Sequence, residues 1–212
     1  MNSVKVLPFV GHNYQRETLW GLEIMILGES HYSDETLCSE FTREVVREML
    51  GGPSKRWMNF FNRTVGVFHG GWCPKETRTR FWSSSIFYNY IQETVGAQSR
   101  IRPTQEMWAK AAPAFEEVLI HLQPRFVLVL GKELWSNLPV TLIPGPLVTL
   151  PDGQAKESRL YFNDAGYSFI FGIAHPSSFG WSYKKWTPWV EAALQVAIQF
   201  QRGSESSPQP WT

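Results

Sequence analysis

Four short apolar runs alternate along the chain with longer segments in which apolar residues recur every three or four positions. The runs occupy residues 22–28, 85–91, 126–130 and 167–174, and the most continuous of them is F-V-L-V-L at 126–130. Apolar runs of this length, bounded by glycine or polar residues, are typical of buried strands. The pattern therefore predicts four strands that are covered on both faces.

The segments between these runs predict helices. Residues 36–50 place apolar side chains at helical spacing and are followed by G-G-P, which ends a helix. Residues 104–122 begin with Thr104 as a helix cap and contain Pro113, which is expected to kink or split that helix. Further helices are expected at 131–138 and 186–202, partial helix in the basic, aromatic segment 55–63, and a glycine-rich loop at 66–74.

Strands that alternate with helices predict an α/β fold with three layers, α/β/α, around a central and mainly parallel sheet of four strands. A length of 212 residues fits one domain. We expect residues 1–202 to form that domain and residues 203–212, which are rich in Ser and Pro, to form a disordered tail. Ligands of such folds bind at the carboxyl ends of the strands, so the residues that follow each strand are the first candidates for chemistry.

Composition excludes several classes of protein. The chain is 43% hydrophobic and 18% charged, which does not fit a disordered protein. Its two cysteines, Cys38 and Cys73, cannot build a four-thiolate metal site or a disulfide framework, and they suit a reducing compartment. No apolar run reaches the roughly 18 residues of a membrane span. We expect a cytoplasmic monomer without a metal or cofactor.

Charge is unevenly distributed. The net charge is +1, but residues 1–40 carry −4, residues 41–110 carry +6 and residues 111–212 carry −1. The chain also contains 14 Phe, 10 Trp and 7 Tyr. A basic segment with interleaved aromatic residues suits a polyanion on whose bases side chains stack. The alternative is a solvated helical face beside ordinary core aromatics.

Polar residues gather where the predicted strands end. The first strand continues into G-E-S-H-Y at 28–32, the second contains Asn89, and the fourth is followed by H-P-S-S-F-G-W at 175–181. Each motif alone is typical of a turn or loop. Together they bring a carboxylate, an amide and an imidazole to one edge of a sheet, which is the arrangement expected of an active site.

These motifs resemble those of the uracil-DNA glycosylase superfamily. G-E-S-H-Y stands where that family has its water-activating loop, I-F-Y-N-Y-I at 86–91 resembles the strand whose Asn reads the flipped base, and A-H-P-S-S-F at 174–179 resembles the family's His-Pro-Ser motif. R-I-R-P-T-Q-E-M-W at 100–108 and P-R-F-V-L-V-L-G-K-E-L-W at 124–135 follow in the order seen in several branches. The resemblance covers about residues 22–196. It implies the family's fold and a monofunctional DNA glycosylase that flips a pyrimidine from DNA and leaves an abasic site.

The resemblance also implies roles for individual residues. Glu29 is expected to orient water and stabilise positive charge on the sugar, His175 to donate to the base oxygen, and Asn89 to bind the base edge. Ser30 and His31 replace the residues usual at their positions. His31 as the base, with Ser30 holding the water, is therefore an open alternative.

Other residues match positions that contact the base or the DNA. Tyr32 matches a residue that crowds the pyrimidine C5 and so favours uracil, and Trp57 or Phe60 is a candidate for stacking under the base, although both equally suit a core. Phe179 is expected to wedge between base steps, or else to pack a surface loop. The candidates for phosphate contacts are Ser177, Ser178, Lys184 and Lys185, the lysines also fitting a solvated helix start.

The base and the activity have alternatives. An asparagine fits the edge of uracil or, turned over, that of cytosine, so the substrate is either uracil or a modified pyrimidine, including the glucosylated hydroxymethylcytosine of phage DNA that one group of this superfamily attacks in bacterial defence. A non-catalytic DNA-binding protein of the same fold is a second reading. A third is a serine esterase with Ser30 as nucleophile and His175 as base, but the nearest acid before His175 is Asp164, too far along the chain for the usual triad order.

Overall fold

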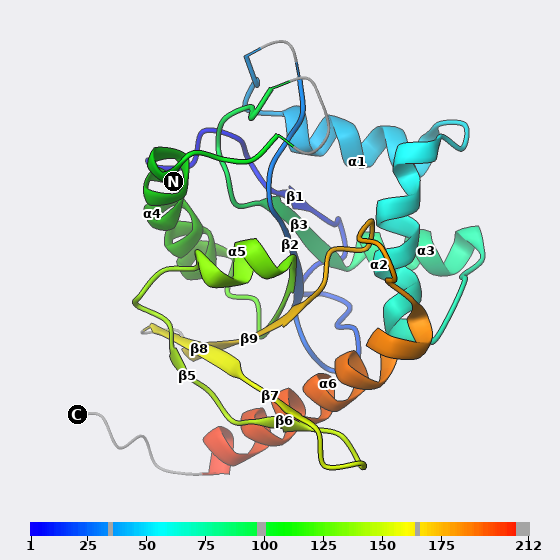
Figure 1. Ribbon diagram of the computed structural model, residues 1–212, viewed down its shortest axis with the longest axis vertical. Helices are drawn as coiled ribbons and strands as arrows, with labels where there is room; N and C mark the ends of the chain where they lie inside the picture. The colour runs from blue at the N-terminus through cyan, green and yellow to red at the C-terminus, as the bar shows by residue number, and fades with distance from the viewer. Residues whose placement is uncertain (34–35, 97–100, 164–165, 207–212) are drawn as a thin grey trace.

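The computed structural model describes residues 1–33, 36–96, 101–163 and 166–206. Over these residues the fold is α/β, with a mixed sheet of seven strands in the order β1-β3-β2-β4-β9-β8-β5 (Figure 1). The prediction of four strands is therefore wrong for the sheet as a whole. The four predicted strands are nevertheless present and adjacent, as β3 (Ser85–Asn89), β2 (Ile24–Gly28), β4 (Phe126–Leu130) and β9 (Gly166–Ile173), and each pairs in parallel with the next.

The additional strands lie at the edges of this parallel group. β1 (Phe9–Val10) pairs antiparallel with β3. On the opposite edge, β8 (Ser158–Asn163) pairs antiparallel with β9, and β5 (Ile143–Pro144) pairs antiparallel with β8. A separate hairpin joins β6 (Val148–Thr149) to β7 (Ala155–Lys156). All but β8 are only two residues long, which is too short to leave an apolar run in the sequence. β8 is longer, but its sequence S-R-L-Y-F-N does not alternate apolar with polar residues, so it leaves no clear strand pattern either.

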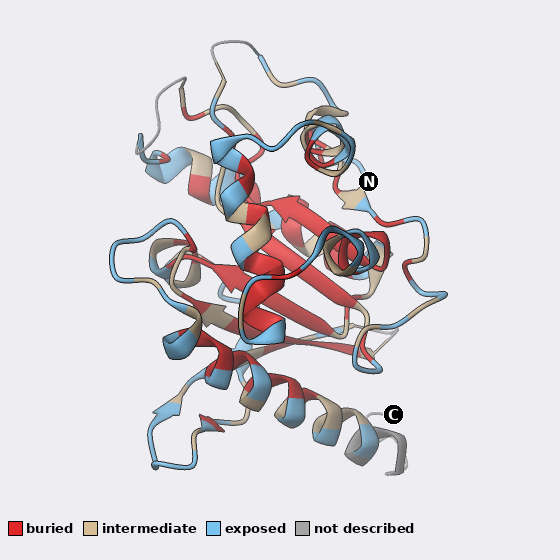
Figure 2. Cartoon of the chain, turned by 90° about the vertical axis from the view of Figure 1, so that its right-hand side faces the viewer, coloured by how far each residue is buried: buried red, intermediate tan, exposed pale blue. Residues whose placement is uncertain are grey.

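Alternate residues of each central strand enter two separate cores. Ile24 and Ile26 of β2 pack with α1 (Phe41–Gly51), α2 (Asn59–His69), α3 (Lys75–Ser83) and α6 (Tyr183–Ser206). Met25 and Leu27 pack on the other face, with α4 (Gln105–Leu122) and α5 (Lys132–Ser136). Figure 2 shows the buried sheet between these helices. Helices on both faces explain why the central strands are buried at nearly every position and are mostly apolar.

Several predicted boundaries change in the structure. The first helix begins at Phe41 rather than at residue 36, because the Ser39 carbonyl accepts a hydrogen bond from the Leu7 N–H (2.8 Å) and so belongs to a loop. The segment 55–63 is helical as predicted, as the 3₁₀ turn η1 (Arg56–Met58) and the start of α2. However, α2 continues through Gly66 to His69, where a loop was expected.

The later helices also differ in detail. α3 was not predicted, because its exposed residues are mostly charged and it is short. Thr104 caps α4 as expected and accepts a hydrogen bond from the Met107 N–H at 3.3 Å, but Pro113 does not split that helix. The last helix runs to Ser206, four residues into the predicted tail, and residues 207–212 lie outside the described residues. No helix in the described part of the chain is long and apolar enough to cross a membrane.

Candidate active site

The three principal candidates lie at the carboxyl edge of the parallel strands. Asn89 ends β3 and is paired with Gly28, the last residue of β2, so that Glu29 follows directly. His175 comes two residues after Ile173, the end of β9. Because these strands are parallel, their carboxyl ends meet at one edge, which is where the sequence placed the site.

Aromatic contacts connect His175 with the other side of this edge. Phe60 of α2 stacks on the His175 ring with centroids 5.1 Å apart and an interplanar angle of 24°. Phe60 also contacts Phe87 of β3, at 6.0 Å between centroids. A Cβ atom on Gly28 would lie 3.3 Å from the Phe87 ring and 2.1 Å from Asn89 Oδ1. His175, Phe60, Phe87, Gly28 and Asn89 are thus a continuous set of neighbours.

The largely buried Glu29 forms an ion pair with the exposed Arg102. Its side chain is 11% exposed, and Oε1 accepts a hydrogen bond from Arg102 Nη1 at 3.1 Å. Arg102 Nε also lies 3.2 Å from Glu133 Oε2. Burial raises the pKa of Glu29 above its ordinary value, while the charge of Arg102 opposes that shift. Arg102 therefore helps to keep Glu29 ionised in a place where burial disfavours the charge.

The neighbouring Ser30 has an unsatisfied hydroxyl. Its Oγ atom is buried and has no hydrogen-bond partner among the described residues. A buried hydroxyl without a partner is costly unless water or a ligand binds it. The Ser30 hydroxyl is therefore suited to bind a water molecule or a ligand atom.

The loop after β9 fixes the tautomer of His175. Its Nδ1 accepts a hydrogen bond from the Ser177 N–H (3.2 Å), so that the proton of a neutral ring is on Nε2. Burial, together with the charge of Arg102, lowers the pKa of His175 to about 4. At neutral pH this residue is an uncharged imidazole with an Nε2–H donor.

Further hydrogen bonds hold the same loop in place. The His175 carbonyl accepts from the N–H and Oγ of Ser178, at 2.8 and 2.5 Å. Arg63 of α2 donates from Nη1 to the Pro176 carbonyl at 2.7 Å and lies over the Trp181 ring. The imidazole is therefore anchored both along its own loop and from α2.

His31 is buried beside Asn89. The two side chains are 5% and 6% exposed, and Asn89 Nδ2 lies 3.0 Å from His31 Nδ1. His31 Nε2 is 2.8 Å from Thr42 Oγ1, and burial lowers the pKa of His31 to about 4. Because neither ring nitrogen is free, this geometry favours Glu29 over His31 as the water-activating group.

The remaining candidates are at the surface around this edge. Tyr32 and Trp57 are 42% and 39% exposed, and Trp57 packs on Phe61 rather than on His175. Of the two stacking candidates, the structure therefore brings only Phe60 to His175. Phe179 is fully exposed. The four candidates for phosphate contacts are also exposed, namely Ser177, Ser178, Lys184 and Lys185.

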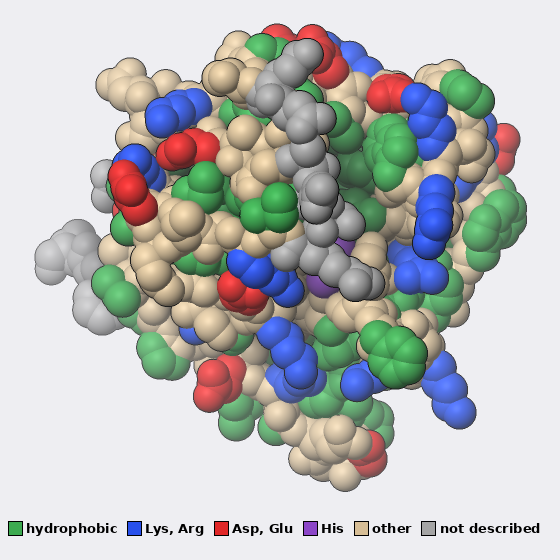
Figure 3. Space-filling view, turned by 45° about the horizontal axis from the view of Figure 1, so that its top comes forward, with side chains coloured by type: hydrophobic (Ala, Val, Ile, Leu, Met, Phe, Trp, Pro, Cys, Tyr) green, Lys and Arg blue, Asp and Glu red, His purple; other side chains and the backbone are tan. Residues whose placement is uncertain are grey.

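The surface at this end of the molecule is recessed. In Figure 3 histidine side chains lie at the bottom of a hollow, with Lys and Arg side chains on both flanks. Basic side chains around a hollow favour the approach of an anionic ligand. Within the described part of the chain, no group of three His, Cys, Asp or Glu side chains could hold a metal ion.

Sequence reasoning missed three residues that support the site. Arg102 lies in the R-I-R-P-T motif, just before the capped helix α4, and that motif was its only signal. Arg63 appears in the sequence as one of many basic residues. Thr42 has no sequence signal at all, because nothing in the pattern shows that α1 packs over His31.

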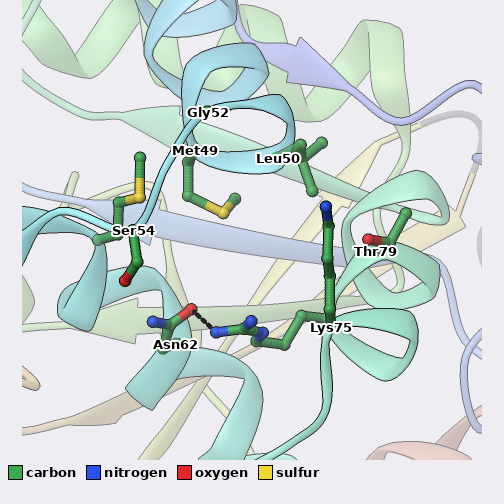
Figure 4. Close-up of a pocket in the computed structure, with 9 residues that line it drawn as sticks. Met49, Leu50, Gly52, Ser54, Asn62, Lys75 and Thr79 are labelled. Carbon is green, nitrogen blue, oxygen red and sulfur yellow. Dashed lines mark hydrogen bonds between the residues drawn. The ribbon is translucent and has the colours of Figure 1, made fainter.

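A separate cavity of about 170 Å³ lies between α1, η1, α2 and α3 (Figure 4). Lys75 extends toward Leu50, and Asn62 Oδ1 accepts a hydrogen bond from Arg78 Nη1 at 2.6 Å. None of the predicted site residues lines this cavity. This cavity is therefore separate from the candidate active site at the sheet edge.

Comparison of the chain with protein-family models and with curated proteins found no match.

Proposed function

We propose that this protein is a DNA glycosylase with a uracil-DNA glycosylase-like fold, which flips a pyrimidine out of DNA and hydrolyses its bond to deoxyribose. The observation that carries the proposal is the neutral His175, whose Nε2–H is fixed as a donor at the same sheet edge as Glu29 and Asn89. A donor that is preorganised for developing negative charge suits a leaving base. The substrates that fit are uracil and modified pyrimidines, including the glucosylated hydroxymethylcytosine of phage DNA.

In the proposed reaction the C1′–N1 bond breaks and the base leaves with the bonding electron pair. Asn89 binds the base edge, and His175 Nε2–H donates to the O2 oxygen as negative charge develops there. Glu29 stabilises the positive charge on the sugar and takes a proton from the water that attacks C1′, with Ser30 Oγ as a second partner of that water. The pyrimidine anion then takes up a proton, which leaves a free base and an abasic site.

Flipping costs a few kcal/mol for each base removed from the stack. The fully exposed Phe179 would fill the gap between base steps. Ser177, Ser178, Lys184 and Lys185 would contact phosphates, so binding should weaken steeply with salt. Phe60, already stacked on His175, is the better placed of the two candidates for supporting the flipped base.

The geometry disfavours the esterase alternative. A serine nucleophile needs a histidine base whose other nitrogen donates to a carboxylate. Here His175 Nδ1 accepts from the Ser177 backbone, and no hydrogen bond joins Ser30 to His175 among the described residues. A DNA-binding protein without catalysis would use the same basic surface, and the experiment below distinguishes it directly.

The test uses duplex oligonucleotides that carry a single uracil, 5-hydroxymethylcytosine or glucosylated 5-hydroxymethylcytosine. An active enzyme leaves an abasic site that alkali cleaves, whereas a binding protein only shifts the band. Glu29→Gln, Asn89→Ala and His175→Ala should each lower the single-turnover rate by about 10²–10³-fold, the usual cost of removing one such group. DNA affinity should change far less, because these groups act on the base and sugar.

Glu106→Gln is the matched control for Glu29→Gln, because Glu106 is an exposed residue of α4 paired with Lys110. It should retain the full rate. Unchanged rates in all three site variants would contradict the proposed site, and strand cleavage with none of the bases would contradict the glycosylase activity.

A further inference from the structure

The cavity between α1, η1, α2 and α3 collects positive charge away from the sheet edge. Lys75 and Arg78 of α3 both line it (Figure 4). They are three positions apart on one helix, so they lie on the same side of it and repel each other. Among the described residues no carboxylate lines the cavity, and the neighbouring Glu48 is already paired with Lys55. The two cations therefore lack a negative partner within the protein.

Asn62 of α2 orients one of these cations. Arg78 Nη1 donates to Asn62 Oδ1 at 2.6 Å, and Arg78 is partly buried. The Nε and Nη2 groups of Arg78 make no side-chain hydrogen bond among the described residues. A guanidinium is planar, so its free N–H groups can bind two oxygens of one anion side by side. Arg78 is thus a preorganised donor in the cavity wall.

Neutral donors complete the polar part of the wall. Ser54 and Thr79 line the cavity, and neither their hydroxyls nor Asn62 Nδ2 form a hydrogen bond within the described part of the chain. The Lys75 ammonium adds three N–H donors on a compact charge. A carboxylate has only two oxygens for so many donors. A phosphate group has more acceptor oxygens and a larger negative charge, and it matches this set better.

The size of the cavity limits what the phosphate can carry. Its volume is about 170 Å³, which is below the roughly 300 Å³ at which pockets for drug-sized ligands begin. Met49, Leu50 and Met58 form its apolar part. The space therefore suits one phosphate group with a small organic substituent, such as the sugar to which it is bonded, rather than a whole nucleotide.

We propose that this cavity is a phosphate-binding site, in which Lys75 and Arg78 bind one phosphate group and Asn62 orients Arg78. Binding replaces the repulsion between the two cations with attraction to a shared anion. The phosphate belongs either to the backbone of DNA or to a small phosphate monoester, since both present the same group. The site shares no residue with the proposed glycosylase site, so the two proposals can fail separately.

The first measurement is an NMR titration of the ¹⁵N-labelled protein with inorganic phosphate and with deoxyribose 5-phosphate, at constant ionic strength set with chloride. We expect amide signals of α3 to shift in the wild type. Lys75→Gln and Arg78→Gln should each weaken binding by about ten-fold or more, the scale of one charge-assisted hydrogen bond. Lys75 is exposed, so its replacement should leave the fold intact.

Arg80→Gln is the matched control. It removes a positive charge from the same helix, but Arg80 does not line the cavity and is paired with Glu17 at 2.7 Å. Its affinity for phosphate should equal that of the wild type.

The second measurement identifies the source of the phosphate, using a DNA duplex without a modified base. If the site binds the DNA backbone, Lys75→Gln and Arg78→Gln should weaken duplex binding, and each should reduce the slope of log affinity against log salt by about one. If it binds a small monoester, both variants should lose phosphate binding and keep the wild-type affinity for the duplex. Either result supports the site.

Two results would overturn the proposal. In the first, Lys75→Gln and Arg78→Gln weaken the binding of neither phosphate nor duplex. In the second, Arg80→Gln weakens binding as much as they do, which would show a general effect of charge rather than a site. Neither measurement depends on base excision, so both remain valid whether or not the protein is a glycosylase.

Discussion

The Asn89 carboxamide packs against the backbone of Gly28 in the candidate site. The two residues are paired across β2 and β3, and the Asn89 oxygen lies where a side chain at position 28 would be. Glycine is the one residue that leaves this space open. The Gly28 position is therefore part of the site although it has no side chain of its own.

A methyl group at position 28 should displace the Asn89 carboxamide. We expect Gly28→Ala to lower base excision by about 10²-fold, the scale of losing one preorganised polar group, because the added Cβ would lie 2.1 Å from Oδ1. The measurement is single-turnover cleavage of the preferred base in duplex DNA. Gly51→Ala is the control, since no atom lies within 4 Å of its added Cβ, and an equal loss of rate in both variants would refute the role of Gly28.

Among the helices, α2 joins the site to the rest of the molecule. Phe60 and Arg63 contact His175 and its loop. One turn further on, Gly66 lies against Tyr183, the first residue of α6, and the Gly66 carbonyl accepts a hydrogen bond from the Gly71 N–H at 3.0 Å. The glycine that appears to end the helix in the sequence is thus a packing position within it.

Filling this position should destabilise the protein. An added Cβ at Gly66 would lie 2.3 Å from the Gly71 oxygen and 2.6 Å from the Tyr183 ring. We expect Gly66→Ala to lower the free energy of unfolding by about 1–3 kcal/mol, the usual cost of overpacking, although alanine favours helix by about 1 kcal/mol. Urea denaturation measures this change. Gly71→Ala, in the same turn, has open space around its Cβ and should remain within about 0.5 kcal/mol of wild type; equal effects of the two changes would argue against the packing account.

At the scale of the whole molecule, the fold keeps imidazole rings neutral inside a protein that carries almost no net charge. His31 is 5% exposed, and burial lowers the pKa of both His31 and His175 to about 4, from an ordinary 6.5. The unfolded chain therefore binds protons at a higher pH than the folded protein does. Stability present above pH 6.5 is lost as the pH falls toward 4.

His31 alone should contribute about 3 kcal/mol to this acid destabilisation, because burial lowers its pKa from an ordinary 6.5 to about 4. We expect the free energy of unfolding of the wild type to fall more steeply between pH 6.5 and pH 4 than that of His31→Gln, which has no proton to take up. Urea denaturation at several pH values measures both slopes. Carboxylates contribute equally to the pH dependence of unfolding in the two proteins. Equal slopes in wild type and His31→Gln would therefore show that His31 is not buried as a neutral ring.

The sequence by itself determined the parallel middle of the sheet and the edge at which Glu29, Asn89 and His175 meet. Both follow from local patterns, because strands covered on both faces are nearly continuous apolar runs and parallel strands present their carboxyl ends together. The short antiparallel strands at the sheet edges left no such pattern. Neither did α3, whose charged surface hides its periodicity.

Only the tertiary structure decided how the side chains at that edge are held. Thr42 reaches His31 from α1, Arg63 reaches Pro176 from α2, and Arg102 reaches Glu29 from the segment before α4. These contacts join residues between 11 and 113 positions apart, and they depend on how helices pack on the sheet. The protonation states of these groups also depend on the tertiary structure. Burial and neighbouring charges set the pKa of each group, and both arise only on folding.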